Sequence, residues 1–224
     1  MNEKVIRPIG FISTPYKEKF GIPRQSKRCS AKGIITLEPE FSSVDAVREI
    51  ECFSHLWLIF EFDKAKENSS LLVRPPRLGG NKKVGVFASR SPFRPNTLGL
   101  SSVKLEKVLS ENGKVQIVVS GVDLLDGTPI FDIKPYIPSS DKIEDAIGGY
   151  SEEFTEYKLD IIFPEELRKK IDKNYILPII ESLVDDPRPA YHEDGKEYGM
   201  RYENYNLKFF VNEKTLTVTK VEIL

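Results

Sequence analysis

The hydrophobic and polar positions of the first 140 or so residues predict a mostly β structure. Residues 5–12 and 33–38 have the β-prone, apolar composition of strands, and residues 46–62 begin with a short helical turn and continue into a strand. Residues 99–120 predict two strands joined by a tight turn at ENGK. Residues 128–138 predict a further strand, which its prolines place at an edge or a mouth of the sheet.

The pattern changes near residue 140, where a polar stretch separates two parts of the chain. Residues 163–186 have helical periodicity, although Pro178 would interrupt or kink the helix. The apolar positions that recur there every four residues are Leu167, Ile171, Tyr175 and Ile179. Residues 198–224 alternate as strands do and contain a second hairpin, with its turn at NEKT. We therefore predict a β-rich domain over residues 1–142 and a small α+β lobe over residues 143–224.

Cysteine content and hydropathy place limits on the environment of the protein. The two cysteines, Cys29 and Cys52, are too few for a disulfide framework. The longest apolar run, HLWLIFEF, is too short to span a membrane. The opening residues lack the charged and apolar regions of a signal peptide. We expect a cytoplasmic protein with free thiols and no membrane segment.

Charge is distributed unevenly, although the net charge is only −1. Residues 74–104 include seven basic and no acidic residues, and residues 17–32 include six basic and one acidic residue. Residues 144–166 include eight acidic residues and one basic residue. Such asymmetry can guide a polyanion to one face of a protein, whereas the simpler interpretation is that solvated loops carry these charges.

Several common kinds of catalytic site are excluded. The two histidines lie far apart in the chain, and no cysteine and histidine cluster has the spacing of a zinc site. The sequence contains no phosphate-binding glycine loop, no Rossmann fingerprint and no nucleophile elbow. We therefore expect no metal, no Rossmann cofactor site and no serine hydrolase chemistry.

The stretch GVFASRSPFRPNTLGLSS contains two arginines, Arg90 and Arg94, and no nearby carboxylate. Pro92 and Pro95 stiffen its backbone, and Gly99 permits a tight turn. Holding long cations in place reduces the entropy lost when an anion binds. The stretch therefore favours an anion clamp over an ordinary loop with an internal ion pair.

Three further segments have side chains suited to a nucleoside ligand. Residues 22–25 (IPRQ) offer a planar fork of donors, or form only a surface turn. His55 stands in an apolar strand beside Trp57, either as a satisfied core residue or with its ring edge toward a flat ligand. Residues 121–136 contain carboxylates that could accept from ribose hydroxyls, although the DG pair there is also a common turn. These carboxylates are Asp123, Asp126 and Asp132.

Six motifs occur in an order that resembles the TsaA-like family, and within it the tRNA N6-threonylcarbamoyladenosine methyltransferases. They are TPYKEKFGIPRQ, FSHLWLIFEF, VRPPRLGG, GVFASRSPFRPNTLGLS, VDLLDGTPIFDIKPYIP and DPRPAY. The resemblance covers nearly the whole chain, with Thr97 at a position where the family often has proline. It implies a mainly β, barrel-like domain that binds S-adenosylmethionine, a homodimer with the cofactor near the subunit interface, and methylation of N6 beside the anticodon of threonine tRNAs.

The resemblance also implies which residues form the site. The expected cofactor contacts are Pro23, Arg24, Gln25, His55, Leu56, Arg90, Leu100, Asp123, Leu124, Leu125 and Asp126. The expected contacts to substrate and to the anticodon loop are Arg74, Arg77, Lys82, Lys83, Phe93, Arg94, Lys134, Tyr136, Arg188 and Tyr191. Basic residues would bind phosphate, aromatic residues would stack on a splayed base, and Arg188 would approach the threonyl carboxylate.

The general base is left open by the sequence. The N6 nitrogen of the carbamoyl form is amide-like, so a base that removes its proton would help the reaction. Asp132, His55 and the carboxylate of the substrate are the candidates. Two other functions are also considered: a non-catalytic nucleotide- or RNA-binding module, and a TsaA-like methyltransferase that acts on another acceptor. The intact polar residues of the pocket motifs argue against loss of the reaction.

Overall fold

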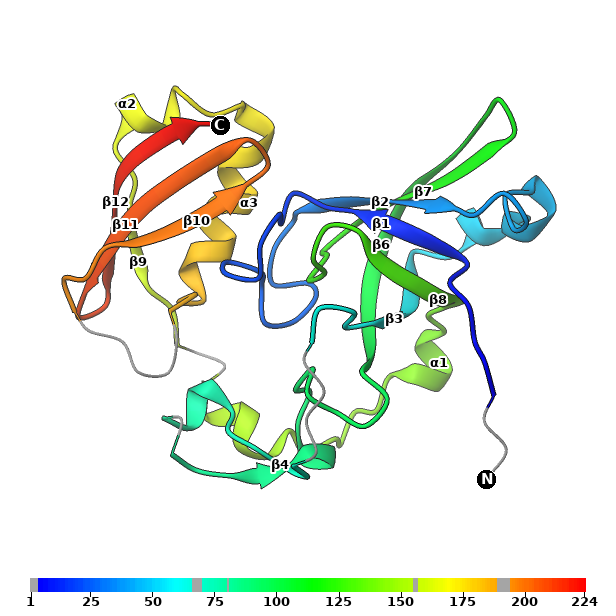
Figure 1. The fold of residues 1–224 in the computed structure, drawn as a ribbon, viewed down its shortest axis with the longest axis horizontal. Helices are drawn as coiled ribbons and strands as arrows, with labels where there is room; N and C mark the ends of the chain where they lie inside the picture. Colours follow the sequence, from blue (N-terminus) through cyan, green and yellow to red (C-terminus); the bar gives the residue numbers. More distant parts are fainter. Residues whose placement is uncertain (1–3, 66–69, 80, 155–156, 189–193) are drawn as a thin grey trace.

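Six antiparallel strands close into a barrel in the order β1-β2-β7-β6-β3-β8 (Figure 1). The computed structural model describes residues 4–65, 70–79, 81–154, 157–188 and 194–224. The barrel strands are β1 (Gly10–Ser13), β2 (Lys32–Leu37), β3 (His55–Glu61), β6 (Leu98–Glu111), β7 (Lys114–Ser120) and β8 (Thr128–Pro135). The mainly β, barrel-like fold expected for this part of the chain is thus confirmed.

Turn chemistry explains the hairpin between β6 and β7. Asn112 and Gly113 have φ values of 50° and 76°, in the left-handed region that asparagine and glycine tolerate best. The prediction for β8 needs a correction, because this strand pairs with β1 on one side and β3 on the other and is therefore not an edge strand. Its prolines, Pro129 and Pro135, lie at the two ends of the strand, where the lost N–H donors cost least.

Shorter elements connect the barrel strands. The 3-10 turns η1 (Val44–Val47) and η2 (Ile50–Cys52) precede β3, as the predicted helical turn did. Between β3 and β6 lies a small two-stranded sheet and its flanking turns. These elements are β4 (Leu72–Val73), η3 (Pro76–Leu78), β5 (Val84–Gly85) and η4 (Val86–Ala88). After β8, the chain forms α1 (Pro138–Asp141) and η5 (Gly149–Phe154).

A second sheet, in the order β10-β11-β12-β9, forms the C-terminal lobe. Its strands are β9 (Asp160–Ile162), β10 (Tyr198–Tyr202), β11 (Tyr205–Asn212) and β12 (Thr215–Ile223), and β9 lies parallel to β12. The predicted hairpin at NEKT joins β11 to β12, as expected.

The single helix expected over residues 163–186 is wrong in extent. Two helices form there, α2 (Glu165–Arg168) and α3 (Lys173–Val184). Asp172 starts the second helix, because its side chain accepts a hydrogen bond from the Asn174 N–H at 2.8 Å. Pro178 is buried inside α3 and does not end it.

The loop between β1 and β2 packs against α3, so one hydrophobic cluster extends through both lobes. The hydroxyl oxygens of Tyr16 and Ser182 lie 3.0 Å apart, and the Cys29 thiol donates to the Pro178 carbonyl at 3.3 Å. Burial raises the pKa of Tyr16 and of Cys29, so both stay protonated and neutral. Both cysteines are free. The domain boundary at residue 142 stays a prediction.

Among the described residues, no helix has the length and apolar character needed to cross a membrane.

Candidate functional site

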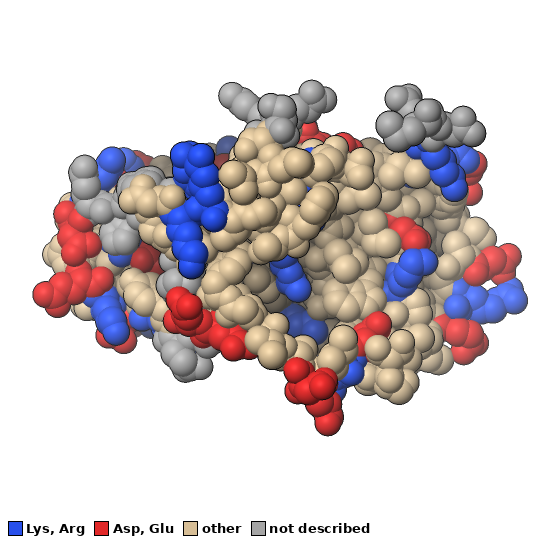
Figure 2. Space-filling model, turned by 90° about the horizontal axis from the view of Figure 1, so that it is seen from below, with Lys and Arg blue, Asp and Glu red and all other residues tan. Residues whose placement is uncertain are grey.

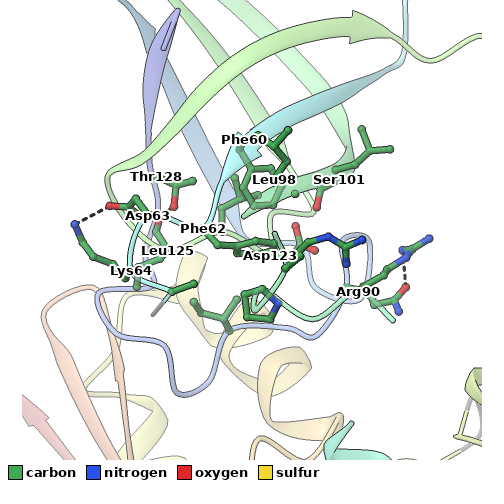
Figure 3. Close-up of a pocket in the computed structure, with 18 of the residues that line it drawn as sticks. Phe60, Phe62, Asp63, Lys64, Arg90, Leu98, Ser101, Asp123, Leu125 and Thr128 are labelled. Carbon is green, nitrogen blue, oxygen red and sulfur yellow. Dashed lines mark hydrogen bonds and ion pairs between the residues drawn. The ribbon is translucent and has the colours of Figure 1, made fainter. Parts of the chain in front are cut away.

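A pocket of about 670 Å³ opens at one end of the barrel, between β3, β6 and three loops (Figure 3). The loops contribute residues 22–25, 89–94 and 123–125. Six of the apolar lining residues are Phe60, Phe62, Leu98, Leu100, Leu124 and Leu125. A pocket of this size with apolar walls and few polar groups is typical of a small-molecule or cofactor site.

Arg90 and Arg94 both line the pocket, and the surrounding loop holds them without a carboxylate partner. Arg90 donates to the Gln25 side-chain oxygen at 3.1 Å, and Arg94 donates to the Ser89 carbonyl at 2.9 Å. Within the described part of the chain, neither guanidinium forms an ion pair with a carboxylate. Their remaining donors are therefore available to an anion, as the anion-clamp interpretation requires.

Asp123 lines the same pocket as Arg90 and Arg94. Its Oδ1 is buried and has no hydrogen-bond partner among the described residues. Burial raises the pKa of the carboxyl to about 6, although the Ser101 hydroxyl, two backbone amides and the Arg90 guanidinium oppose the shift. An unpaired buried carboxylate oxygen is costly unless a ligand satisfies it. The pocket therefore fits a ligand with both an anionic group and hydroxyl or ammonium donors.

Gly99 shapes the apolar wall of the pocket. A Cβ added at this position would lie well inside the van der Waals radius of the Phe60 ring. We expect Gly99→Ala to lower the unfolding free energy by about 1–3 kcal/mol, because the ring must move within a packed wall. Thermal denaturation checks this expectation. The matched control is Gly85→Ala, because an added Cβ there meets no atom within 4 Å. Equal losses of stability in Gly99→Ala and Gly85→Ala would contradict the expectation.

The pocket brings together eight of the eleven residues expected at the cofactor. They are Pro23, Arg24, Gln25, Arg90, Leu100, Asp123, Leu124 and Leu125. His55, Leu56 and Asp126 are not among the lining residues. Leu56 is fully buried in the barrel, and Asp126 instead accepts a hydrogen bond from the Thr14 N–H and pairs with Lys17 at 3.1 Å.

Sequence reasoning missed one side of the pocket, at the end of β3. Asp63 and Lys64 line it there and pair with each other at 2.6 Å. Lys19 also lines it and donates to the Lys64 carbonyl. The signal that could have found them is their place directly after the strand FSHLWLIFEF, where a barrel strand reaches its rim.

The two protein candidates for the general base lie outside this pocket. Asp132 on β8 pairs with Lys134 at 3.1 Å, and residues His55 and Asp132 are both absent from the lining. Burial, and then Lys27 and Lys104, lower the pKa of His55, so its ring is neutral near neutral pH.

The residues expected at the substrate are dispersed. Phe93 and Arg94 line the pocket, whereas Arg74, Lys82 and Lys83 are exposed outside it. Tyr136 lies beside Trp57, with ring centroids 5.6 Å apart. The side chain of Arg77 and the whole of Tyr191 lie outside the described residues. In Figure 2, acidic and basic side chains both lie around a largely uncharged surface with a hollow, so this face is not uniformly basic.

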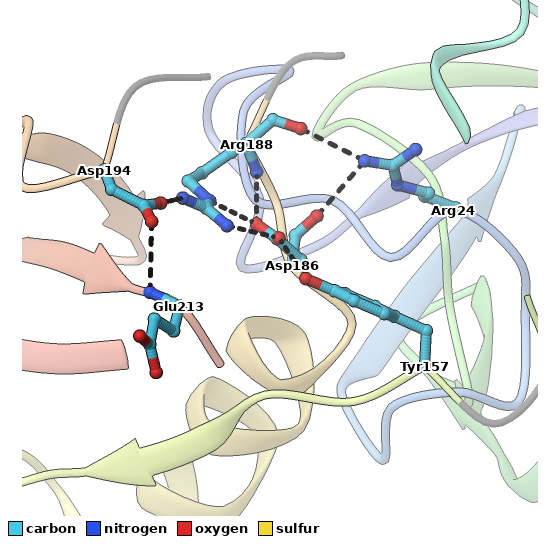
Figure 4. A network of polar contacts seen from close by, with 6 residues as sticks. All are labelled: Arg24, Tyr157, Asp186, Arg188, Asp194 and Glu213. Atoms are coloured by element: carbon cyan, nitrogen blue, oxygen red, sulfur yellow. Dashed lines mark hydrogen bonds and ion pairs between the residues drawn. The ribbon is translucent and has the colours of Figure 1, made fainter. Parts of the chain in front are cut away.

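The guanidinium of Arg188 is buried and already paired with carboxylates (Figure 4). Its side chain is 1% exposed and makes two hydrogen bonds of 2.8 Å to Asp186, with a third of 3.1 Å to Asp194. Arg24 donates to the backbone carbonyls of Asp186 and Arg188 at 3.1 Å each. Arg188 thus supports the loop that holds Arg24, and its expected contact with the substrate carboxylate stays a prediction.

The fold and the pocket together define a two-lobed β-barrel protein with a site for a partly apolar, anionic ligand of cofactor size. Models of the tRNA-methyltransferase O N-terminal and C-terminal domains match residues 11–142 and 156–223. The chain belongs to this tRNA-methyltransferase O (TrmO) family.

Curated and solved relatives extend the similarity along the chain. The tRNA (adenine(37)-N6)-methyltransferase of Escherichia coli is 41% identical over 225 residues, which covers 96% of each chain. A probable S-adenosyl-L-methionine-binding protein of Pyrococcus abyssi is 38% identical over 82% of this chain and 94% of its own. The crystal structure of TrmO from Pseudomonas aeruginosa has a TM-score of 0.79 and 32% identity, and covers 99% of this chain and 100% of its own.

Proposed function

We propose that this protein is an S-adenosylmethionine-dependent methyltransferase that methylates N6 of threonylcarbamoyladenosine beside the anticodon of threonine tRNAs. The observation that carries the proposal is the pocket that joins a buried, unpartnered Asp123 oxygen to Arg90 and apolar walls, in a chain of this family. The names of the Escherichia coli and Pyrococcus abyssi relatives support the reaction and the cofactor.

Residues of the pocket match the parts of the proposed cofactor. Arg90 is suited to a carboxylate, since among the described residues its guanidinium donates to the neutral Gln25 amide and forms no ion pair. Asp123 is suited to hydroxyl or ammonium donors, and the leucines at 100, 124 and 125 are suited to a flat base. The bound cofactor would supply an electrophilic methyl group on a cationic sulfur. The protein must mainly hold the acceptor nitrogen in line with it, which is a proximity effect.

We also propose where the tRNA and a second copy of the chain would bind. The exposed basic residues Arg74, Lys82 and Lys83 would contact phosphate without reading sequence. A homodimer is supported by Leu98 and Leu100, which line the pocket with 36% and 55% of their surface exposed. A tRNA-modifying enzyme of this kind would act in the cytoplasm.

Mass analysis of nucleosides tests the proposed reaction. The purified protein is incubated with S-adenosylmethionine and tRNA from cells that lack the enzyme, with a matched control without cofactor. We expect threonylcarbamoyladenosine to be converted to its N6-methyl form only when the cofactor is present. Unmodified tRNA together with retained cofactor binding would point to another acceptor or to a binding module without catalysis.

Substituting Arg90 separates the roles of the pocket and of the surrounding surface. We expect Arg90→Ala to weaken binding of S-adenosylhomocysteine by about 10- to 100-fold, because a charge-assisted hydrogen bond is lost, while tRNA affinity falls only modestly. The matched control is Arg74→Ala, an exposed arginine outside the pocket. It should leave cofactor affinity unchanged and should lower the magnitude of the slope of log K for tRNA binding against log salt concentration by about one. Calorimetry and filter binding measure the two affinities. Unchanged cofactor affinity in Arg90→Ala would count against this assignment.

A further inference from the structure

Three aromatic rings cluster on the outside of the barrel, next to the pocket, with the Tyr136 ring inclined at 47° to Trp57 and at 64° to His55. We call His55, Trp57 and Tyr136 the aromatic shelf. His55 and Trp57 occupy alternate positions on β3 and therefore lie on the same face of the strand. Tyr136 follows β8, and its backbone N–H donates to the His55 carbonyl at 2.9 Å. The Trp57 and Tyr136 ring centroids lie 5.6 Å apart, and those of His55 and Tyr136 lie 6.3 Å apart.

The shelf is held in place before any ligand arrives. The Trp57 indole N–H donates to the Asp141 carboxylate in α1 at 3.1 Å, which fixes the plane of the ring. All three rings are half-buried, so each keeps part of its surface open to solvent. A preformed aromatic surface loses little conformational freedom when a flat ligand stacks on it.

Two lysines flank the shelf, together with the Asp141 carboxylate that holds Trp57 and the Glu106 carboxylate that pairs with Lys104 at 3.1 Å. The Lys27 ammonium lies over the Tyr136 ring, 5.2 Å from its centroid, and forms no ion pair with any described residue. Lys104 stands opposite His55 in the pairing of β6 with β3. Burial, followed by Lys27 and Lys104, lowers the pKa of His55, so its ring stacks as a neutral imidazole near neutral pH. Aromatic rings beside an unpaired cation are the combination that binds single-stranded nucleic acid.

A shared residue and a short stretch of chain connect the shelf to the pocket. Trp57 belongs to the shelf and also lines the pocket. Lys27 follows Gln25 by two residues, and Gln25 accepts the hydrogen bond from Arg90. The acceptor nucleotide must reach the mouth of the cofactor pocket, so its neighbour in the strand would lie beside the shelf, with the intervening phosphate toward Lys27.

We propose that the aromatic shelf binds one unpaired nucleobase of the RNA substrate, next to the acceptor nucleotide at the mouth of the cofactor pocket. The proposal rests on the proposed function. It also gives a role to Tyr136, which does not line the pocket, and to Lys27, which has no carboxylate partner among the described residues. Single bases stack on aromatic side chains whatever their sequence, so the shelf would position the loop without selecting a particular base.

Trp57 is the only tryptophan of the chain, so its emission reports directly on the shelf. The wild-type protein is first saturated with S-adenosylhomocysteine and then titrated with an anticodon stem-loop RNA. An RNA duplex of equal length serves as the control without unpaired bases. We expect the stem-loop to quench Trp57 emission in a saturable manner and the duplex to leave it nearly unchanged. Saturation with the cofactor product first removes the contribution of the pocket itself.

A variant pair tests the same surface by affinity. Tyr136→Leu should weaken stem-loop binding about tenfold, the typical loss for one stacked base, and leave S-adenosylhomocysteine binding unchanged. Phe210→Leu removes a half-buried aromatic ring from β11 in the second sheet and should change neither affinity. Stem-loop binding without quenching of Trp57 emission would overturn the proposal. Equal affinities of Tyr136→Leu and Phe210→Leu for the stem-loop would also overturn it. So would a monomer produced by Tyr136→Leu from a wild-type dimer, because the shelf would then be an interface between copies.

The same experiments distinguish failure of the shelf from failure of the proposed function. If wild-type protein methylates tRNA but Trp57 does not respond to the stem-loop, only the shelf proposal fails. If tRNA is neither bound nor methylated, the proposed function fails as well.

Discussion

Replacing Arg188 with alanine is expected to lower the unfolding free energy by about 3 kcal/mol or more. The guanidinium is almost fully buried and pairs with Asp186 through two hydrogen bonds of 2.8 Å. Removing one partner of a buried pair leaves the other charge without compensation, which typically costs about 3–5 kcal/mol. Asp186 would keep neutral donors, the Tyr157 hydroxyl at 3.3 Å and the backbone N–H of residue 188 at 3.2 Å, but would lose the buried guanidinium that neutralises it. Chemical denaturation of the ligand-free protein measures the loss.

The same substitution should also weaken the pocket. Arg24 lines the pocket and donates to the carbonyls of Asp186 and Arg188, so a disordered loop would remove these two hydrogen bonds. We expect the affinity for S-adenosylhomocysteine to fall several-fold.

Two further variants separate the effect of breaking the buried ion pair from the effect of removing a positive charge. Lys169→Ala removes an exposed pair with Glu165 and should leave the denaturation midpoint unchanged. The double variant Asp186→Asn/Arg188→Met removes both charges and should recover much of the stability lost in Arg188→Ala. The single variants Asp186→Asn and Arg188→Met are measured as well. If the loss of unfolding free energy in the double variant equalled the sum of their two losses, the ion pair would not be the cause.

Replacing Asp123 with asparagine is expected to stabilise the protein without ligand and to weaken cofactor binding. In the folded protein the carboxyl has a pKa of about 6, compared with 3.8 for an unperturbed group. Between these pH values the folded state binds more protons than the unfolded state, so the unfolding free energy falls as the pH rises. Above pH 6 the full cost of the ionised, buried group is present, about 3 kcal/mol at most.

Asparagine carries no charge, so the difference between Asp123→Asn and wild type should be largest above pH 6 and should vanish near pH 4. Thermal denaturation at a series of pH values, without ligand, measures it. Asp63→Asn is the matched control, because Asp63 also lines the pocket but is exposed. It removes a carboxylate from the same pocket and leaves Asp123 intact, so an effect shared by both variants would reflect the loss of charge alone. A wild-type stability that rises between pH 4 and pH 6 relative to Asp123→Asn would contradict the assignment.

Cofactor binding should respond in the opposite direction. The ionised Asp123 would accept hydrogen bonds from the ligand, so wild-type affinity for S-adenosylhomocysteine should decline about tenfold per pH unit below pH 6. Asp123→Asn should bind weakly and without this pH dependence. Opposite effects on stability and on binding are typical of a polar group kept unsatisfied for a ligand.

Local patterns were sufficient for much of the secondary structure. The alternation of HLWLIFE predicted β3, and the ENGK turn predicted the β6–β7 hairpin, because two residues with left-handed φ are needed there. Local patterns failed where a helix restarts at Asp172 and where β8 joins two neighbours despite its prolines. At Asp172 the overlooked signal is a local N-cap, whereas at β8 the pairing with β1 and β3, which are distant in the chain, outweighs the local effect of proline.

The candidate site divides in the same way. The proline- and arginine-rich stretch around Arg90 indicated an anion clamp, because no carboxylate was close in sequence to neutralise it. Sequence spacing could not show that Asp63 and Lys64 reach the pocket while Asp126 is held by Lys17 outside its lining. Which residues share a rim depends on how the barrel closes.

The sequence by itself determined the β-rich composition, the two hairpins, the cationic loop and, through six ordered motifs, the family. Only the tertiary structure decided that Arg188 is a buried support and that Asp123 has an unsatisfied oxygen. It also decided that Trp57 and Tyr136 meet beside the pocket. The physical reason is that hydrogen-bonding partners and desolvation are set by neighbours far away in the chain, and neither is encoded in the residue type or in local spacing.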